Sequence, residues 1–239
     1  MRSVSLLAAA FLAALIFVGV AARAQARLLD EAAPKAVGRL NIGGQGHCTA
    51  SLIAPDLIVT AAHCLRNART GARWRAERLV FLPGYDRGAY AALARGAEVV
   101  VPEDWTPETV ARDLAAVLIA PSIDPAPEGV APFETADLAR PGLAVWTVSY
   151  GRDRPEAPSR EADCEVSARR GDLILTTCEA TPGVSGAPVL TDTPDGPVLI
   201  AVAVAAANAR PPAMRGQAVA VTAGPVLSRL GADLRKEVR

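Results

Sequence analysis

The segment TPGVSGAP, residues 181–188, places a glycine two positions before Ser185 and another directly after it. Gly, Pro and Ser dominate ordinary turns, so a plain surface turn is one interpretation of the segment. The other is a tight loop that presents a nucleophilic hydroxyl beside free backbone N–H groups, because Gly183 has no Cβ to hinder such a turn. The segment alone does not decide between the two.

A general base for such a nucleophile is available in IVTAAHC, residues 58–64. His63 in this segment is one of two histidines in the chain. An imidazole with an ordinary pKa of about 6.5 accepts and returns a proton near neutral pH. An isolated histidine is usually a core or surface residue without chemistry, and we expect His47, beside Cys48, to be such a residue on a surface rim.

An acid that can orient His63 stands in VARDLAAVLIA, residues 110–120, at the start of an apolar run. If Asp113 is buried, its carboxylate must be paired or hydrogen-bonded, because an unpaired buried charge is costly. An imidazole N–H would satisfy it and would hold the ring in the tautomer that a base needs. A solvated aspartate is the alternative, and Asp104 in PEDWTP is a rival acid.

The order His63, Asp113, Ser185 along the chain excludes one class of hydrolase. The α/β-hydrolases have the order Ser, Asp, His and a G-x-S-x-G motif between a strand and a helix. Residues 183–187 read GVSGA and miss the second glycine of that motif by one position.

The first 26 residues predict a secretory signal peptide. Arg2 precedes an apolar run over residues 6–20, and AARAQA follows, with cleavage expected after Ala26. An uncleaved membrane anchor is the alternative, but the run is shorter than the roughly 20 residues of a spanning helix. We therefore expect a secreted or periplasmic protein with no stable membrane span after cleavage, and the Ala- and Arg-rich composition indicates a bacterial source.

Charge excludes another class of function. Removal of Arg2 and Arg23 leaves 23 basic against 25 acidic residues, a net charge near −2. Such a chain has no basic footprint for nucleic acid or anionic lipid. We expect no nucleic-acid partner.

Four cysteines in an exported chain favour disulfides. Three pairings are possible, and the sequence favours Cys48–Cys64 and Cys164–Cys178, each closing a short loop worth about 3 kcal/mol. The alternative, a zinc site, lacks the usual C-x2-C and H-x3-H spacings. We expect no metal.

Short apolar segments separated by turn signals predict a mostly β chain. A connector with five prolines, residues 121–141, divides it into two all-β parts, and Thr222 is a candidate N-cap of a C-terminal helix with Val226, Leu227, Leu230 and Leu234 on one face. The pattern indicates paired β-barrels. The predicted strands lie at 49–53, 57–60, 78–82, 97–101, 114–120, 143–150, in two hairpins over 164–178 and 187–205, and at 217–222.

LIAPDLIVTAAHC, RDLAAVLI and CEATPGVSGAPVL resemble the three signature segments of chymotrypsin-fold serine proteases, most similarly the bacterial exported branch that includes the glutamyl endopeptidases. The resemblance covers about residues 36–222. It implies two six-stranded antiparallel β-barrels and a C-terminal helix. The first half, 27–125, would carry His63 and Asp113, and the second half, 126–239, would carry Ser185.

The resemblance also implies roles for single residues. His63 would be general base and then general acid, Asp113 its orienting partner, and Ser185 the nucleophile that forms an acyl-enzyme with a peptide substrate. The N–H groups of Gly183 and Ser185 would bind the oxyanion, and the bond between Cys48 and Cys64 would tie the base to its strand. No cofactor is implied.

The chain departs from the animal digestive members before the serine, where Val184 replaces an aspartate that pairs with a newly cut N-terminus. We expect activity without that ion pair. Glu179 stands where trypsin-like members carry the acid that attracts basic side chains, and a solvated loop acid is the alternative. The other pocket wall is expected in residues 200–208, with Ala203 and Val204, and it lacks the histidine that glutamate selectivity would require.

Two other functions stay open at this point. One is a catalytically weak or inactive protease-fold protein with a binding or regulatory role. The other is an esterase or acyl transferase, because acyl transfer at a serine is generic chemistry. We expect the protein to be a monomer whichever function it has.

Overall fold

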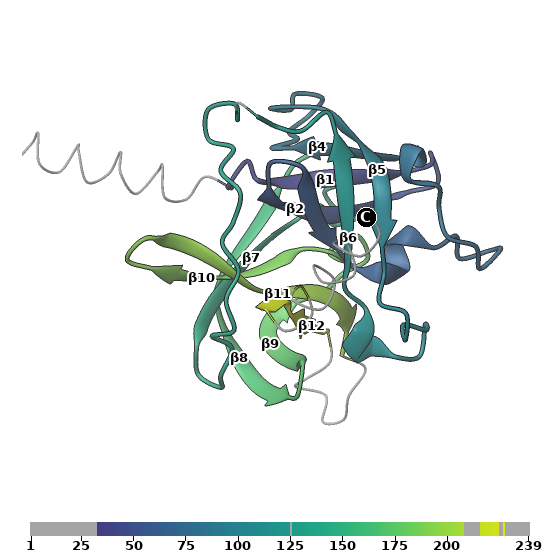
Figure 1. Cartoon of the computed structure of the whole chain (residues 1–239). Coiled ribbons are helices and arrows are strands. Elements are labelled where there is room, and N and C mark those ends of the chain that lie inside the picture. Colours follow the sequence, from purple (N-terminus) through teal and green to yellow (C-terminus); the bar gives the residue numbers. More distant parts are fainter. Residues whose placement is uncertain (1–32, 125, 208–215, 225–226, 228–239) are drawn as a thin grey trace, which may run out of the picture. The chain divides into compact units, whose positions relative to one another are not determined.

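Two closed antiparallel barrels of six strands each make up most of the computed structural model (Figure 1), which describes residues 33–124, 126–207, 216–224 and 227. Both barrels lie within one compact unit that begins at Pro34. The predicted fold of two six-stranded antiparallel barrels is confirmed. The predicted signal peptide falls outside the described residues, as does nearly all of the predicted C-terminal helix, so both stay predictions.

The first barrel has the strand order β1-β2-β3-β6-β5-β4. Short 3-10 helices interrupt the connections at η1 (Ala62–Leu65), η2 (Ala76–Arg78) and η3 (Val110–Arg112). Its strands are β1 (Val37–Ile42), β2 (His47–Ala54), β3 (Leu57–Thr60), β4 (Leu79–Pro83), β5 (Ala94–Val100) and β6 (Ala115–Ala120).

The second barrel has the order β10-β11-β12-β9-β8-β7. Both predicted hairpins are present, because β8 pairs with β9 and β10 pairs with β11. Its strands are β7 (Ala144–Ser149), β8 (Ser159–Arg170), β9 (Leu173–Glu179), β10 (Pro188–Thr193), β11 (Gly196–Ala206) and β12 (Gln217–Thr222).

Strand β1 is absent from the sequence prediction. Val37, Leu40 and Ile42 are buried in the barrel, but a glycine and polar residues interrupt the apolar pattern between them. Gly38 has a packing reason, since a Cβ there would lie 2.5 Å from the ring atom Cε2 of Phe81. The strand therefore depends on a neighbour that sequence pattern does not reveal.

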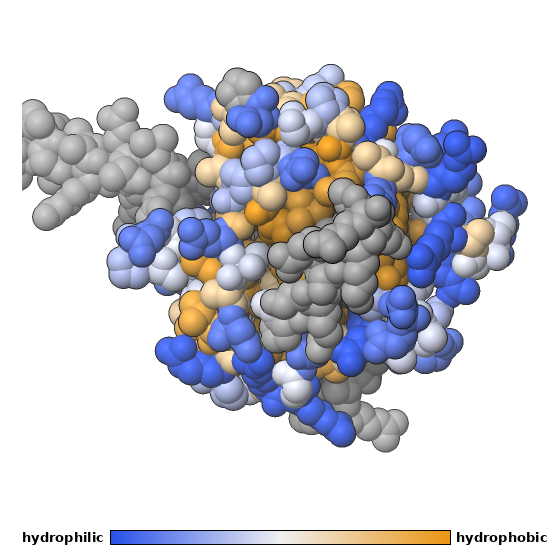
Figure 2. Space-filling view, in the orientation of Figure 1, coloured by the Kyte–Doolittle hydropathy of each residue, from blue (hydrophilic) through white to orange (hydrophobic). Residues whose placement is uncertain are grey.

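Apolar side chains fill the inside of both barrels. Phe81, Leu40 and Ile58 are fully buried in the first barrel, and Ile174 and Ile200 in the second. Each such burial contributes roughly 1.5–3 kcal/mol. On the face drawn in Figure 2, hydrophilic residues gather towards the rim and hydrophobic residues nearer the middle. Among the described residues, no helix has the length and apolar character needed to cross a membrane.

The proline-rich connector between β6 and β7 binds both barrels. The Phe133 N–H donates to the Leu52 carbonyl of β2, and Leu199 of β11 donates to the Glu134 carbonyl. Thr135 also forms an isolated bridge with Leu199. Consecutive connector residues thus hold β2 and β11 on either side of one segment.

Candidate active site

His63 is positioned by one turn of 3-10 helix at the end of β3. Its neighbour Cys64 is bonded to Cys48 on β2. The backbone N–H of His63 donates to Oδ1 of Asp113 over 2.7 Å, and the N–H of Ala62 donates to the Asp113 carbonyl over 3.3 Å. The loop that carries the imidazole is therefore fixed on both sides.

The ring of His63 uses the second oxygen of the same carboxylate. Nδ1 lies 2.7 Å from Oδ2 of Asp113, which is 8% exposed and stands between η3 and β6. A carboxylate only accepts hydrogen bonds, so Nδ1 carries the proton and Nε2 of the neutral ring has a lone pair that can accept one. Nε2 lies 3.8 Å from Sγ of Cys64, a disulfide sulfur that has no proton to donate. The rival acid, Asp104, is exposed and pairs with Arg112 over 2.8 Å.

The loop around Ser185 depends on two glycines in left-handed conformations. Gly183 has a φ of +99°, and a Cβ there would lie 2.6 Å from the Tyr150 carbonyl oxygen. Gly186 has a φ of +86°, and a Cβ there would collide with the Thr49 carbonyl oxygen. Only glycine tolerates both the conformation and the approach.

This loop leaves two backbone donors without a protein acceptor. The N–H groups of Val184, Gly186 and Ala187 donate to carbonyl oxygens within the second barrel. Within the described ranges, no carbonyl or side chain accepts from the N–H of Gly183 or of Ser185. Two donors two residues apart, beside a serine hydroxyl, can bind a negatively charged oxygen.

Thr49 of β2 attaches this loop to the first barrel. Its N–H donates to the Ser185 carbonyl over 2.9 Å. Its hydroxyl donates to the Gly183 carbonyl over 3.2 Å and accepts the Tyr150 N–H over 3.0 Å. Thr49 is fully buried, so these bonds are shielded from water.

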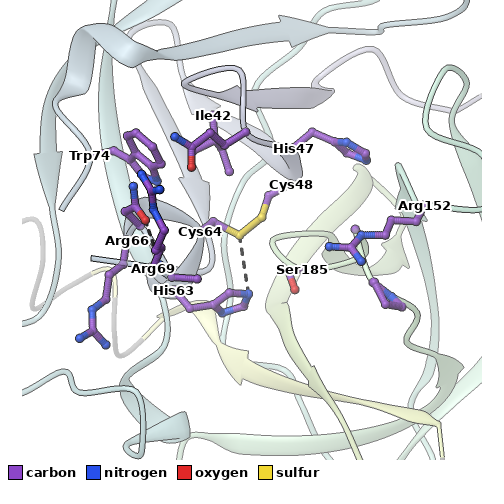
Figure 3. A pocket seen from close by; sticks show the side chains of 16 residues that line it. Ile42, His47, Cys48, His63, Cys64, Arg66, Arg69, Trp74, Arg152 and Ser185 are labelled. Carbon is purple, nitrogen blue, oxygen red and sulfur yellow. Dashed lines mark hydrogen bonds between the residues drawn. A yellow bond between two sulfur atoms is a disulfide. The ribbon is translucent and has the colours of Figure 1, made fainter. Parts of the chain in front are cut away.

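His63 and Ser185 line one cavity of about 650 Å³, together with Gly183 and the disulfide of Cys48 and Cys64. Figure 3 shows the Ser185 hydroxyl to one side of the His63 ring, and the disulfide above the ring with a marked contact to it. The imidazole is 39% exposed at its side chain, so a molecule in the cavity can reach it. A base, a hydroxyl and two free N–H groups therefore border one space.

A second cavity of about 200 Å³ adjoins Ser185. Its walls are small and mostly apolar, and no charged side chain is among the described residues that line it. The lining residues are Ala180, Thr181, Pro182, Val184, Ser185, Ala203, Ala205 and Ala206.

The two other residues expected in the substrate pocket lie outside this cavity's lining. Val204 is buried. Glu179 is exposed, and its N–H donates to the carboxylate of Glu161. Burial raises the pKa of Glu161, and the nearby charge of Glu179 adds to the shift. Asn208, at the end of the expected wall, lies outside the described residues.

Val184, which stands where the animal digestive proteases have an aspartate, packs against apolar residues. It is 6% exposed and forms an apolar cluster with Ala187, Ala203 and Ala218. A carboxylate in these surroundings would be desolvated, whereas valine stabilises the loop by packing.

His47 lies closer to the site than expected. It lines the cavity of His63 and is half-buried, and its Nε2 donates to the Tyr150 carbonyl over 2.9 Å. Burial lowers its pKa below the ordinary value, although the bond to the carbonyl opposes the shift.

Comparison with known proteins agrees with this geometry. A family model described as a trypsin-like peptidase domain matches residues 48–202, more than half of the chain. The chain belongs to the trypsin-like peptidase family. Its structural neighbours show that it has the fold of the chymotrypsin-like serine proteases, and no curated protein matches it.

Three solved structures illustrate the likeness. A Glu endopeptidase in complex with MPD has a TM-score of 0.69 at 16% identity, with 84% of this chain and 91% of that chain covered. A thermostable serine protease, AL20, from an extremophilic microorganism has a TM-score of 0.64 at 17% identity, with 82% of this chain and 94% of that chain covered. The protease Anisep from Arthrobacter nicotinovorans has a TM-score of 0.63 at 16% identity, with 82% of this chain and 93% of that chain covered.

Both predicted disulfides are present in this peptidase-family chain, Cys48–Cys64 and Cys164–Cys178. Cys48 and Cys64 gather with His63, and the other pair lies beside Glu161, in arrangements that could hold a metal ion if the thiols were free. Because each sulfur is bonded to another, neither group offers a thiolate ligand.

Sequence reasoning missed Thr49 and three arginines of the larger cavity, Arg66, Arg69 and Arg152. Thr49 had a weak signal, because it is one of two polar residues, with Ser51, in the short strand segment that follows Cys48. The arginines had none, since they stand in two loops that only the fold brings together.

We expect removal of the two disulfides to have different effects on activity. Replacement of Cys164 and Cys178 by serine should cost about 3 kcal/mol of unfolding free energy, a fall in Tm of about 10 °C, and leave kcat/KM unchanged at 25 °C. Replacement of Cys48 and Cys64 should cost a similar amount of stability and also lower kcat/KM, because Cys64 adjoins His63. Thermal melts and peptide hydrolysis measure both. An equal loss of kcat/KM in the two variants would contradict the prediction.

Proposed function

We propose that this chain is an exported serine endopeptidase that hydrolyses peptide bonds through His63, Asp113 and Ser185. One observation carries the proposal. The carboxylate of Asp113 holds both the backbone and the ring of His63, which leaves Nε2 available on the cavity that Ser185 shares. This is the arrangement that turns a weakly acidic hydroxyl into a nucleophile.

In the first half of the reaction, Oγ of Ser185 bonds to the substrate carbonyl carbon while its proton moves to Nε2 of His63. The carbonyl π electrons move to oxygen and give a tetrahedral oxyanion. The C–N bond then breaks as Nε2 returns the proton to the leaving nitrogen. The amine departs, and the acyl group stays on Ser185 as an ester.

In the second half, water gives a proton to Nε2 of His63 and adds to the ester carbonyl. The Ser185 oxygen leaves and regains its proton from His63. Asp113 keeps its negative charge throughout and stabilises the imidazolium in each half. The side-chain exposure of His63 lets water reach Nε2 for this step.

The oxyanion of both halves is bound by the N–H groups of Gly183 and Ser185, which lack a protein acceptor among the described residues. Each donor of this kind is worth about 3 kcal/mol in the transition state. The glycine conformations and the bonds from Thr49 hold both donors before substrate binds.

The small cavity beside Ser185 takes the side chain that precedes the cleaved bond. Its alanine-rich wall and volume of about 200 Å³ fit a small aliphatic side chain. The exposed position of Glu179, outside this wall, supports the alternative of a solvated loop acid. Two disulfides suit an oxidising extracellular or periplasmic compartment, in agreement with the proposed signal peptide.

The roles of the two acids can be tested against each other. Asp113→Asn should lower kcat for a fluorogenic peptide by about 10⁴-fold, because the ring loses the partner that selects its tautomer. Ser185→Ala should abolish the acyl-enzyme burst. Asp104→Asn, the matched control, should retain wild-type kcat. If Asp104→Asn and Asp113→Asn lose activity equally, the assigned triad is wrong, and if the wild type has no activity, the binding-protein alternative holds.

Specificity should follow the small cavity. Matched peptides with Ala, Leu, Arg or Glu before the cleaved bond are expected to rank Ala above Leu, with Arg and Glu poorest, since a buried charge there would meet no partner. The comparison uses kcat/KM on one peptide frame. A preference for Arg would instead give Glu179 the attracting role.

Activity should not require a cut N-terminus, because Val184 packs in an apolar cluster and can form no ion pair. A chain with extra residues before Arg27 is expected to match the kcat/KM of the chain that begins at Arg27. The two forms are compared by intact mass and peptide hydrolysis. A loss of several orders of magnitude in the extended form would overturn this expectation.

A further inference from the structure

The larger cavity is basic, although the mature chain is predicted to be close to neutral. Arg66, Arg69 and Arg152 line it together with His47 and His63. No carboxylate is among the described residues on its wall. Figure 3 shows arginines on both sides of the disulfide, with the Arg152 side chain directed towards Ser185. The positive charge is therefore concentrated where a substrate would lie.

Two of the arginines stand on an ordered loop between η1 and η2. Nε of Arg66 donates to the Gly71 carbonyl over 2.7 Å. Oδ1 of Asn67 accepts the Arg69 N–H over 2.9 Å, and the Gly71 N–H donates to the Asn67 carbonyl over 2.8 Å. These bonds hold the loop backbone and the guanidinium of Arg66 at the cavity, while the Arg69 side chain is exposed.

The third arginine is held against the Ser185 loop. The Arg152 N–H donates to the Pro182 carbonyl over 2.8 Å. Burial is the main cause that lowers the pKa of His47; the charge of Arg152 is the smallest contribution to that lowering, and the charge of Glu156 opposes it. The adjacent Asp153 does not line the cavity, and its Oδ1 lies close to Gly151 instead.

None of these three arginines forms an ion pair with any described carboxylate, whereas several other arginines of the chain do. Arg39 pairs with Glu156, Arg112 with Asp104, and Arg169 with Asp137. Among the described residues, no ion pair neutralises these three charges, so an anionic ligand group would be attracted to them.

The chemistry of the proposed triad decides which part of a substrate meets these charges. His63 must give its proton to the leaving nitrogen, so the leaving segment lies on the His63 side of Ser185. His63 lines the basic cavity and is absent from the lining of the small one. The acyl part thus occupies the small cavity, and the residues after the cleaved bond enter the basic one.

We propose that the basic cavity selects peptides whose leaving segment, the first three residues after the cleaved bond, carries carboxylates. Its volume of about 650 Å³ has room for several residues. The direction of the substrate rests on the proposed function, whereas attraction of a carboxylate rests only on the charges.

Turnover is measured on three peptides with one acyl part ending in Ala and an amidated C-terminus. Their leaving segments are Asp-Glu-Glu, Asn-Gln-Gln and Lys-Lys-Lys. The acidic peptide should exceed the amide peptide in kcat/KM by about tenfold or more, and the basic peptide should be poorest. The preference should shrink at high salt, because the Debye length falls from about 10 Å at 0.1 M to about 3 Å at 1 M.

Charge removal tests the assigned residues. The double variant Arg69→Gln, Arg152→Gln should bring the ratio of acidic to amide turnover close to one, and this ratio is insensitive to the fraction of folded enzyme. Arg140→Gln, an exposed arginine in the connector, is the matched control and should keep the wild-type ratio. A preference that survives in the double variant would overturn the proposal, as would equal turnover of all three wild-type peptides.

Binding separates this proposal from the proposed function. Fluorescence anisotropy of the same peptides on the full Ser185→Ala chain should show tighter binding of the acidic peptide. If the wild type hydrolyses nothing yet this binding order holds, the proposed function fails and the carboxylate site stands. Equal binding of all three peptides would overturn the site whatever the activity.

A fourth peptide distinguishes the two sources of a carboxylate. It has the leaving segment Asn-Gln-Gln with a free C-terminus in place of the amide. Turnover equal to that of the acidic peptide would make the chain end the recognised group, whereas turnover equal to that of the amidated form would assign recognition to Asp and Glu side chains. Either result keeps a carboxylate as the ligand.

Discussion

Two adjacent residues of β2 connect both halves of the proposed catalytic arrangement, and the rest of the site depends on them. Cys48 is bonded to Cys64 beside the base, and Thr49 binds the carbonyl groups on either side of Val184. A base on one barrel and a nucleophile on the other must keep their separation within a fraction of an ångström for proton transfer. Because one strand holds both the base and the nucleophile loop, movement of one barrel relative to the other changes their separation less than it would if each were attached to a different element.

This arrangement supports our proposal that the oxyanion loop is organised without an ion pair to the N-terminus. The loop is held from the first barrel by Thr49 and from within the second by the apolar packing of Val184. Gly186 lacks a Cβ where the Thr49 carbonyl approaches, so the contact needs glycine at that position. In our proposal, hydrogen bonds and packing that form on folding do for this loop what the ion pair with a newly cut N-terminus does in the animal digestive members.

The sequence could predict those features that have a local pattern. Most strands have an apolar run between turn residues, and His63 and Asp113 stand out as polar residues at the ends of such runs. Strand β1 was not predicted because Gly38 interrupts its apolar pattern. A glycine is needed there because a Cβ would collide with the ring of Phe81. The role of Thr49 and the gathering of the three arginines depend on residues far apart in the chain, such as the 134 positions between Thr49 and Gly183. No local pattern records such contacts.

We propose that base, nucleophile and oxyanion donors are already assembled in the folded chain, before any cleavage of its N-terminus. Fluorophosphonate labelling of the chain that begins at Arg27, followed by intact mass and peptide mapping, tests it most directly. We expect one adduct per molecule, on Ser185, and none on Ser185→Ala. An unlabelled wild type, or an adduct on another residue, would contradict it.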